Sequence, residues 1–368
     1  MSNMDASPLS RRAFLNVLGA APLAAATLAQ AAQQTTPQGA GSLTDAGGLR
    51  VGHFTDRRRP TGCTVILFDQ PARAGVDYNG SAPAESLGVT LQPTSPLDRI
   101  HAILLTGGGP MALGATAGVV RFLEEQGVGY DWGVHNVRVP IVVGAAIDDL
   151  ALGDGRIRVG ADEAYRACQS AATTPVMEGS VGAGTGATVG KLFVGRGMAG
   201  MKGGVGCASA RLGKVVISAL VVVNAAGDII DWRRGTIVAG ARTKDGRGFA
   251  RTADVLRRDL ESRTANAPLA EGPLRATTLA VIATNVAFTK TELTKLAMMA
   301  NTGAARAIHP YHTQSDGDQM LAVSTGSLPA NVSLTAFGAI AAEVVADAVV
   351  RAVLAATSVA GWTAVRDL

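Results

Sequence analysis

The stretch that says most about this chain is Arg275-Ala276-Thr277-Thr278-Leu279-Ala280-Val281-Ile282-Ala283-Thr284-Asn285. Its run of leucine, alanine, valine and isoleucine predicts a buried β-strand that begins at Thr277. Residues 266–273 precede it and contain two prolines and a glycine, which predicts an exposed linker. A threonine freed by cleavage of the bond before it would carry a hydroxyl nucleophile and an α-amino base on one residue. Thr277 is therefore a candidate nucleophile.

Apolar strand candidates and helical patterns alternate irregularly along the rest of the chain. Strands are expected at residues 49–54, 63–68, 102–105, 139–143, 214–224 and 320–325. Helices are expected up to residue 125 and at residues 160–172, 254–263, 289–308 and 334–356. The last of these is apolar nearly all round, which predicts burial or a subunit interface. Because no regular strand–helix–strand period is present, an α/β fold with a layered αββα sandwich fits at least as well as a doubly wound sheet.

The N-terminal residues have the three-part layout of an export signal. Ser10-Arg11-Arg12-Ala13-Phe14-Leu15 is a twin-arginine pattern, residues 17–28 are an apolar run, and Ala29-Gln30-Ala31 is a small-x-small cleavage site. Residues 1–31 are therefore predicted to direct export by the twin-arginine route, which implies a periplasmic or secreted protein. The alternative is a disordered N-terminal arm. Residues 32–47 are predicted to be a flexible leader.

The composition excludes several classes of function. A net charge of +4 is not the footprint of a nucleic-acid-binding protein, so no nucleic-acid partner is expected. After the export signal, no stretch reaches the roughly 20 apolar residues of a membrane span, so no span is expected. Cys63, Cys168 and Cys207 are too widely spaced for a disulfide framework or a paired metal site, and small buried side chains are expected.

Other patterns that carry chemistry are weak. No G-x-S-x-G pentapeptide of a serine hydrolase occurs. Gly107-Gly108-Gly109 follows a predicted strand and favours tight packing of strand on helix over nucleotide binding. His309 and His312 lack a nearby glutamate or cysteine pattern, which favours a structured loop over a zinc site. Asp316-Gly317-Asp318 lacks the other ligands of an EF-hand. No metal or cofactor is therefore expected.

Five polar residues remain, each at the end of an apolar element: Thr277, Lys191, Asn224, Asp316 and Asp318. An α-amino group titrates at about 8, so the freed amine of Thr277 could act as a general base without histidine. A lysine or an asparagine amide can stabilise a tetrahedral oxyanion. Two carboxylates can orient the ammonium or hydroxyl group and keep a neighbouring lysine charged.

Several motifs occur in an ordered series: Val181–Lys191, Lys202–Gly206, the strand that ends at Asn224, Thr277–Asn285, and Ile308–Asp318. In these motifs, and over nearly the whole chain from Gly48 to the last helix, the sequence resembles the DmpA/NylC family of self-cleaving hydrolases. One branch of that family contains D- and β-aminopeptidases, and the other contains nylon-oligomer (6-aminohexanoate-oligomer) endohydrolases. The resemblance implies a layered αββα sandwich and a tetramer of αβ units.

The resemblance also implies where the chain is cut and which residues act. The family's precursor is cut immediately before its nucleophile, which falls here on the Ala276–Thr277 bond and gives an α-subunit over residues 48–276 and a β-subunit over residues 277–368. The cut uses the hydroxyl of the nucleophile in an N-to-O acyl shift, and the mature enzyme reuses that hydroxyl to form an acyl-enzyme. The family's lysine, oxyanion-binding amide and paired carboxylates fall on Lys191, Asn224, Asp316 and Asp318.

Two departures from the family concern the cut and the substrate. Ala276 stands where nylon hydrolases commonly have asparagine and aminopeptidases have glycine. Nylon hydrolases have a tyrosine in the region of Asp148, and aminopeptidases have a glutamate near Ala145, but this sequence has neither. Asp148 lies in this region and is a candidate substrate-binding residue, although the pair Asp148-Asp149 can equally cap a helix or a turn.

The threonine nucleophile and the Asp-x-Asp pattern resemble the nylon-oligomer branch more than the serine-using aminopeptidases. The expected function is hydrolysis of amide bonds in linear ω-amino-acid oligomers, such as those of 6-aminohexanoate, or in peptides. The alternatives within the family are a D- or β-aminopeptidase and an amino-acid amidase or esterase. The alternative from another class is a non-catalytic binding or assembly protein on the same scaffold.

Overall fold

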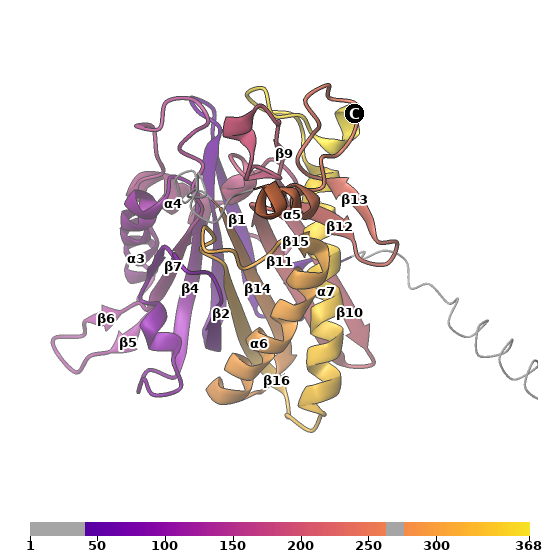
Figure 1. Cartoon of the computed structure of the whole chain (residues 1–368). Helices are drawn as coiled ribbons and strands as arrows, with labels where there is room; N and C mark the ends of the chain where they lie inside the picture. Colours follow the sequence, from indigo (N-terminus) through magenta and orange to yellow (C-terminus); the bar gives the residue numbers. More distant parts are fainter. Residues whose placement is uncertain (1–40, 263–275) are drawn as a thin grey trace, which may run out of the picture. The chain divides into compact units, whose positions relative to one another are not determined.

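The computed structural model describes residues 41–262 and 276–368 (Figure 1). The predicted export signal over residues 1–31 and the predicted linker over residues 266–273 lie outside the described residues. The helices are α3 (Thr116–Glu124), α4 (Ala161–Gln169), α5 (Thr252–Ser262), α6 (Lys290–Ala307) and α7 (Leu334–Ala355). The strands of the main sheet are β1 (Leu49–Asp56), β2 (Thr61–Tyr78), β3 (Glu85–Ser86), β4 (Arg99–Thr106), β7 (Val142–Ala146), β10 (Gly204–Leu212), β11 (Val215–Asn224), β14 (Thr277–Val286) and β16 (Gln319–Leu328). The shorter strands are β5 (Tyr130–Asp131), β6 (Arg138–Val139), β8 (Thr188–Val189), β9 (Met201–Lys202), β12 (Asp228–Asp231), β13 (Thr236–Ala239) and β15 (Ile308–His309).

The main sheet runs in the order β10-β11-β14-β16-β2-β4-β7-β3, with β1 paired to β2 beside this path. Most neighbours are antiparallel, whereas β14 pairs with β16 and β4 pairs with β7 in parallel. The first part of β2 pairs with β1 and β4, and its last part pairs with β16. The register of β2 with β4 shifts between Leu67 and Ala72. Strand β2 thus belongs to two half-sheets, one with β1, β4, β7 and β3 and one with β16, β14, β11 and β10.

The two half-sheets pack face to face. One buried apolar cluster contains side chains from both, among them Ile103 of β4 and Val281 of β14. Strands β14 and β7 also contact each other, although β16, β2 and β4 separate them in the sheet. Because successive residues of a strand point to opposite faces, each half-sheet has a second face to cover.

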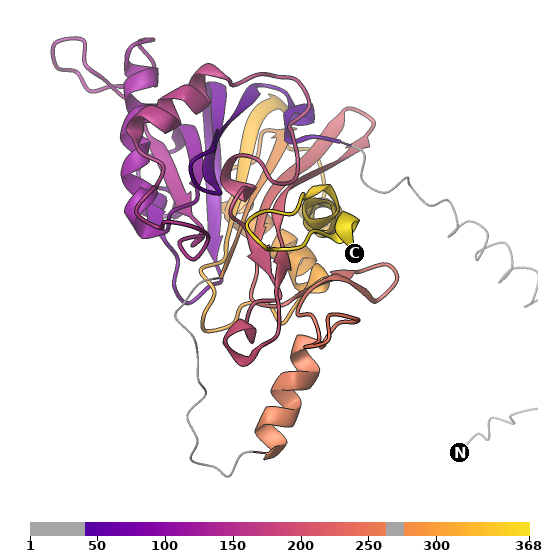
Figure 2. The ribbon, with the colours of Figure 1, turned by 90° about the horizontal axis from the view of Figure 1, so that it is seen from above.

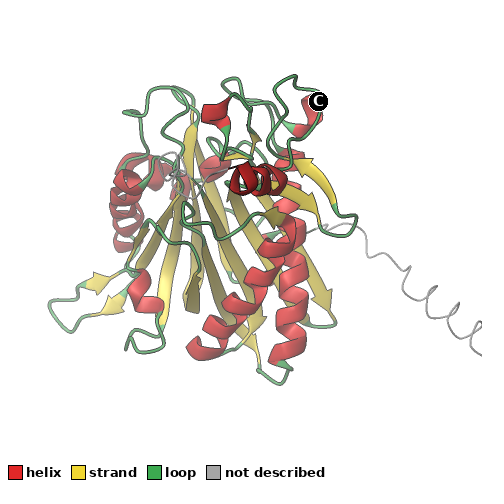
Figure 3. Cartoon of the chain, viewed as in Figure 1, coloured by secondary structure: helices red, strands yellow, loops and turns green. Residues whose placement is uncertain are grey.

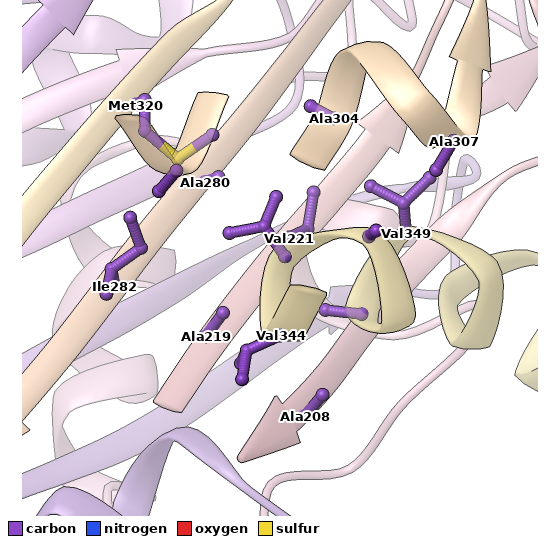
Figure 4. Packing of buried hydrophobic residues seen from close by; sticks show 14 of the residues in the cluster. Ala208, Ala219, Val221, Ala280, Ile282, Ala304, Ala307, Met320, Val344 and Val349 are labelled. Atoms are coloured by element: carbon purple, nitrogen blue, oxygen red, sulfur yellow. The ribbon is translucent and has the colours of Figure 1, made fainter. Parts of the chain in front are cut away.

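Helices cover the outer faces of the two half-sheets. Helices α6 and α7 pack on the half that contains β14, and Figure 4 shows Val344 and Val349 of α7 beside Val221 of β11. Helices α3 and α4 cover the other half, where Leu104 of β4 lies in a separate apolar cluster. Figures 1 and 3 show the two helix pairs on opposite sides of the strands. The layers are helix, strand, strand and helix, so the predicted αββα sandwich is confirmed.

The last helix, α7, is buried along much of its length, as its apolar sequence predicts. Its buried side chains belong to the same cluster as the outward face of β11 and β14. In residues 41–262 and 276–368, no helix is both long and apolar enough to cross a membrane.

Over its described residues, helix α5 confirms the predicted helix at 254–263, and it begins two residues earlier, at Thr252; residue 263 lies outside the described residues. Figure 2 shows it standing apart from the sheet. Leu260 on this helix is 71% exposed, which is consistent with that position. Helix α5 is the last described element before Ala276.

The predicted flexible leader over residues 32–47 is wrong at its C-terminal end. Leu43–Ala46 form a 3-10 helix, and the fully buried Leu43 joins the cluster between the half-sheets. The hydroxyl of Ser218 in β11 donates to the Leu43 carbonyl oxygen at 2.9 Å. Leu43 and Ala46 are both buried in this polar, glycine-containing segment, and composition gave no sign of these contacts. Residues 32–40 lie outside the described part of the chain.

Candidate active site

The sheet brings the predicted site residues to one end of β14. Strand β11 is antiparallel to β14, and its last residue, Asn224, stands opposite Thr277, the first residue of β14. Strand β16 lies on the other side of β14, and Ala276 forms a bridge with Asp316 just before β16 begins. The Ala276–Thr277 bond therefore lies between Asn224 on one side and the turn Asp316-Gly317-Asp318 on the other.

Thr277 and the bond before it are buried. Thr277 is 5% exposed and Ala276 is 6% exposed. Thr277 Oγ1 donates to the Ala276 carbonyl oxygen at 2.6 Å, and the Gly317 amide donates to the same oxygen at 2.9 Å. Hydrogen bonds to a carbonyl oxygen stabilise the negative charge that develops when its carbon is attacked. The carbonyl oxygen of this bond thus accepts from both a hydroxyl and a backbone amide.

The turn that carries Gly317 is held by the backbone after β2. The Gly80 amide donates to the Asp318 carbonyl oxygen and the Ala82 amide donates to the Asp316 carbonyl oxygen, each at 3.1 Å. A Cβ at Gly317 would lie 2.5 Å from the Ala82 carbonyl oxygen and 2.9 Å from Thr277 Oγ1. Only glycine therefore fits at this position without a shift of the turn or of the threonine.

Asn224 and Lys191 form a connected pair on the other side of Thr277. Asn224 is fully buried, and its Oδ1 accepts from Lys191 Nζ at 2.5 Å and from the Thr188 amide at 3.0 Å. Its Nδ2 donates to the Asp148 carbonyl oxygen at 3.1 Å. Because an ammonium only donates and a carbonyl only accepts, these partners fix the direction of the side-chain amide.

Asp148 reaches this pair through its backbone. Its carboxylate accepts from the Leu150 amide at 2.9 Å, so the predicted turn cap is confirmed, while a role in substrate binding stays a prediction. Its neighbour Asp149 forms an ion pair with Arg59 at 2.6 Å, and neither side chain is exposed. This pair anchors the segment whose carbonyl orients Asn224.

The two carboxylates have different partners. Asp316 accepts from the Thr313 amide at 2.9 Å and from its hydroxyl at 2.6 Å. Burial, together with the charge of Asp318, raises the pKa of Asp316 to about 6, and Lys191 opposes this shift. Asp318 accepts from the Thr278 amide at 2.6 Å, and His312 Nδ1 lies 3.2 Å from its other oxygen.

A buried lysine supports the glycine-rich segment before Lys191. Lys202 Nζ donates to the carbonyl oxygens of Gly184 at 2.9 Å, Ala187 at 2.7 Å and Gly203 at 3.0 Å. Burial lowers the pKa of Lys202 to about 7. An ammonium that binds three carbonyls satisfies backbone groups that a glycine-rich loop leaves outside regular structure.

The structure adds three groups to the predicted set: the Gly317 amide, Lys202 and His312. The glycine between two aspartates was a signal for a close backbone approach, and Lys202 stood out as the charged residue in a glycine-rich motif. His312 was predicted to be part of a structured loop, and no spacing rule connected it with Asp318. Across the described ranges, no three histidine, cysteine, aspartate or glutamate side chains form a group that could hold a metal ion.

The chain is similar to known proteins over most of its length. The sequence profile of Peptidase family S58 matches residues 41–366. The chain belongs to Peptidase family S58. This is the DmpA/NylC family, so the resemblance seen in the sequence motifs is confirmed. Membership in S58 makes the chain a member of a hydrolase family.

Both branches of S58 appear among the similar proteins. An uncharacterized aminopeptidase of Mycobacterium tuberculosis is 37% identical over 354 residues, which cover 89% of this chain and 97% of that protein. A 6-aminohexanoate-oligomer endohydrolase of Agromyces sp. is 34% identical over 319 residues, which cover 84% of this chain and 84% of that protein.

Solved structures support the fold. A Burkholderia β-aminopeptidase has a TM-score of 0.63 at 24% identity, covering 88% of this chain and 90% of that one. The L-aminopeptidase D-Ala-esterase/amidase of Ochrobactrum anthropi has a TM-score of 0.61 at 23% identity, covering 86% of both chains. The latter is described as a variant of the Ntn-hydrolase fold, and the αββα layers of this S58 chain match that fold type.

Proposed function

We propose that this chain is a self-cleaving amidohydrolase in which Thr277 attacks first its own Ala276–Thr277 bond and then the amide bonds of substrates. One observation carries the proposal: the Ala276 carbonyl oxygen accepts from both Thr277 Oγ1 and the Gly317 amide. A nucleophile and an oxyanion donor on the same peptide bond are the two groups that acyl transfer needs.

Self-cleavage begins when Thr277 Oγ1 forms a bond to the Ala276 carbonyl carbon and passes its proton to a base. The bond from that carbon to the Thr277 nitrogen then breaks as the nitrogen takes up a proton. Water hydrolyses the resulting ester, which leaves a carboxylate on Ala276 and a free amine and hydroxyl on Thr277. Asp316, whose backbone forms a bridge with Ala276, is our candidate for this base, and its pKa of about 6 leaves it ionised at neutral pH.

The mature reaction uses the same hydroxyl. The freed α-amine, with a pKa of about 8 in an unperturbed terminus, takes the Thr277 proton as Oγ1 attacks the substrate carbonyl. Asn224 and Lys191 stabilise the oxyanion, and the leaving amine departs with a proton to give an acyl-enzyme that water hydrolyses. Asp318 holds the Thr278 amide and so fixes the peptide that carries the nucleophile.

We propose linear ω-amino-acid amides, such as 6-aminohexanoate oligomers, or peptides as substrates. The relatives named 6-aminohexanoate-oligomer endohydrolase support this class, as does the threonine nucleophile with two aspartates. The relatives named aminopeptidase support the alternative, an enzyme that removes D- or β-amino residues. Amine release only from chain ends would decide for the aminopeptidase, whereas internal cleavage of an end-blocked oligomer would decide for the endohydrolase.

The direct test is a denaturing gel combined with N-terminal sequencing of the purified protein. We expect two fragments, the smaller of which begins at Thr277. The variant Thr277→Ala should stay uncut and inactive, and Thr277→Ser should still be cut because it keeps the hydroxyl. An uncut and inactive wild-type chain would instead support a non-catalytic binding or assembly protein.

Two further parts of the proposal rest on the sequence. We propose export by the twin-arginine route and assembly into a tetramer of αβ units. Replacement of Arg11 and Arg12 by lysine should block export, which fractionation of the host cell measures. Light scattering of the purified protein measures its mass and so tests the tetramer.

A further inference from the structure

We infer that His312 is a positioning residue for Asp318, and through Asp318 for the nucleophile Thr277. The inference rests on the proposed function, because it concerns how the proposed nucleophile is held. His312 Nδ1 lies 3.2 Å from Asp318 Oδ2, while Asp318 Oδ1 accepts from the Thr278 amide at 2.6 Å. A carboxylate only accepts, so His312 carries its hydrogen on Nδ1 in this contact.

Asp318 needs a donor on each oxygen because it is fully buried. With His312 on Oδ2, the carboxylate cannot rotate away from Thr278, the residue directly after the nucleophile. Without it, a buried carboxylate oxygen loses its donor, which favours rotation of the carboxylate toward another donor. That rotation would release the Thr278 amide and let Thr277 Oγ1 move relative to the Ala276 carbonyl.

The imidazole ring of His312 also contacts the ring of Tyr311. It lies 3.8 Å, centroid to centroid, from the ring of Tyr311, with an angle of 32° between the planes. The Tyr311 hydroxyl donates to Asn301 Oδ1 at 2.9 Å, and Asn301 Nδ2 donates to Asp77 Oδ2 at 3.1 Å. Asn301 belongs to α6 and Asp77 to β2, so the ring is tied to two elements of the sandwich.

The backbone of His312 gives a second, independent sign. Its φ angle is +56°, in the left-handed region that non-glycine residues seldom adopt. Such a conformation has a conformational cost, and it persists only where the surrounding contacts determine it. In this conformation the His312 side chain contacts Asp318 and stacks on Tyr311.

The experiment compares the rate of self-cleavage in four variants. Each is made by cell-free synthesis, and its cleavage is followed by pulse–chase labelling. His312→Ala removes the donor, and we expect cleavage to slow about 10- to 100-fold, because a small misplacement of a nucleophile has effects of that size. In His312→Asn the amide nitrogen falls near the position of Nδ1, and asparagine tolerates the left-handed backbone, so cleavage should stay within about threefold of wild type. In His312→Gln the amide nitrogen falls near Nε2, so this variant should be as slow as His312→Ala. His309→Gln, at an exposed residue of β15 three positions before His312, is the control and should be unchanged.

A merely structural role gives a different pattern. It predicts that His312→Asn and His312→Gln cleave at the same rate, and that outcome would overturn the inference. Thermal unfolding of each variant in an uncut Thr277→Ala background separates loss of fold from loss of position. In the fully cut protein, we expect His312→Ala to lower kcat and leave KM unchanged, because His312 positions the nucleophile and not the substrate.

The two hypotheses fail in different ways. A wild-type chain that stays uncut contradicts the proposed function. A wild-type chain that is cut, together with a His312→Ala variant that is cut equally fast, contradicts only the role of His312.

Discussion

The two strands that flank β14 support the Ala276–Thr277 bond in different ways. On the β16 side the donor belongs to the backbone, because the Gly317 amide donates to the Ala276 carbonyl oxygen. On the β11 side the polar groups are side chains, with Lys191 Nζ on Asn224 Oδ1. The fold places a backbone donor, and a substitution can displace that donor but cannot remove it. A substitution can remove a side-chain donor altogether.

This difference suggests a division of work between the two sides. In the proposed mechanism the Gly317 amide acts on the carbonyl of the bond that is cut, and Asn224 acts on the carbonyl of the substrate. Substitutions on the β16 side should therefore affect self-cleavage more than turnover, and substitutions on the β11 side should do the reverse.

The largest effect is expected for Gly317→Ala. The added methyl group would meet the Ala82 carbonyl oxygen and Thr277 Oγ1 at distances below van der Waals contact, so it displaces the donor and the nucleophile together. Loss of one oxyanion donor lowers rates about 10²- to 10³-fold, and we expect self-cleavage to fall by about 10³-fold. The fraction of cut chain over time, read from a gel, measures this.

Gly114→Ala is the matched control for that experiment. A Cβ at Gly114 meets no atom within 4 Å, so the chain should be cut at the wild-type rate. Equal cleavage by both glycine variants would contradict the role given to the Gly317 amide.

The same contrast explains how much of the site could be predicted from the sequence. Lys191, Asn224, Asp316 and Asp318 carry distinctive side chains at the ends of apolar elements, and the sheet register brings them to one end of β14. The hydrogen bond of the Gly317 amide was not predicted, because every residue except proline has an amide. The glycine signals a close backbone approach, but only the fold shows which group its amide meets.

The fold follows the same logic. Apolar periodicity was enough to predict β11, β14, α6 and α7 nearly to their observed ends. This was possible because apolar residues recur along most of the length of each of these elements. Strand β2 was predicted to end at residue 68 but continues to Tyr78, through Asp69, Gln70 and Pro71. A polar interruption with a proline marks a strand end in isolation, but here it lies where β2 passes from one half-sheet to the other.

Asn224→Ala sharpens the comparison from the β11 side. It removes an amide that the proposed mechanism places on the substrate oxyanion, and it removes one oxygen to which Lys191 Nζ donates while leaving another, Thr188 Oγ1. We expect kcat of the fully cut protein to fall about 10²-fold, with a smaller effect on self-cleavage. Steady-state kinetics on an amide substrate and the gel assay on the same preparation give the two numbers. A larger loss in cleavage than in turnover would reverse the assignment of the two sides.

The pH dependence of self-cleavage tests Asp316 as the base. Because burial raises its pKa to about 6, the carboxylate is lost as the pH falls through 6. We expect the cleavage rate to drop about tenfold for each pH unit below this value and to level off above it. The residual rate of Asp316→Asn should lack this inflection. Asp162→Asn, at an exposed carboxylate on α4, should keep the wild-type profile.

The smallest effect concerns stability, and it runs opposite to activity. A raised pKa means that the folded state binds the Asp316 proton more tightly than the unfolded state does. The ionised carboxylate therefore destabilises the fold above pH 6. This destabilisation disappears as the pH falls toward 4, because Asp316 is then protonated in the folded state. In an uncut Thr277→Ala background, Asp316→Asn should raise the free energy of unfolding at pH 8 by on the order of 1–3 kcal/mol, and the difference should vanish near pH 4. Urea unfolding at the two pH values measures it. A stabilisation that is equal at both pH values would show that charge is not its cause. The expected pattern would show that the ionised Asp316 carboxylate on the β16 side is costly to the fold, as a stability–activity trade-off at the proposed base requires.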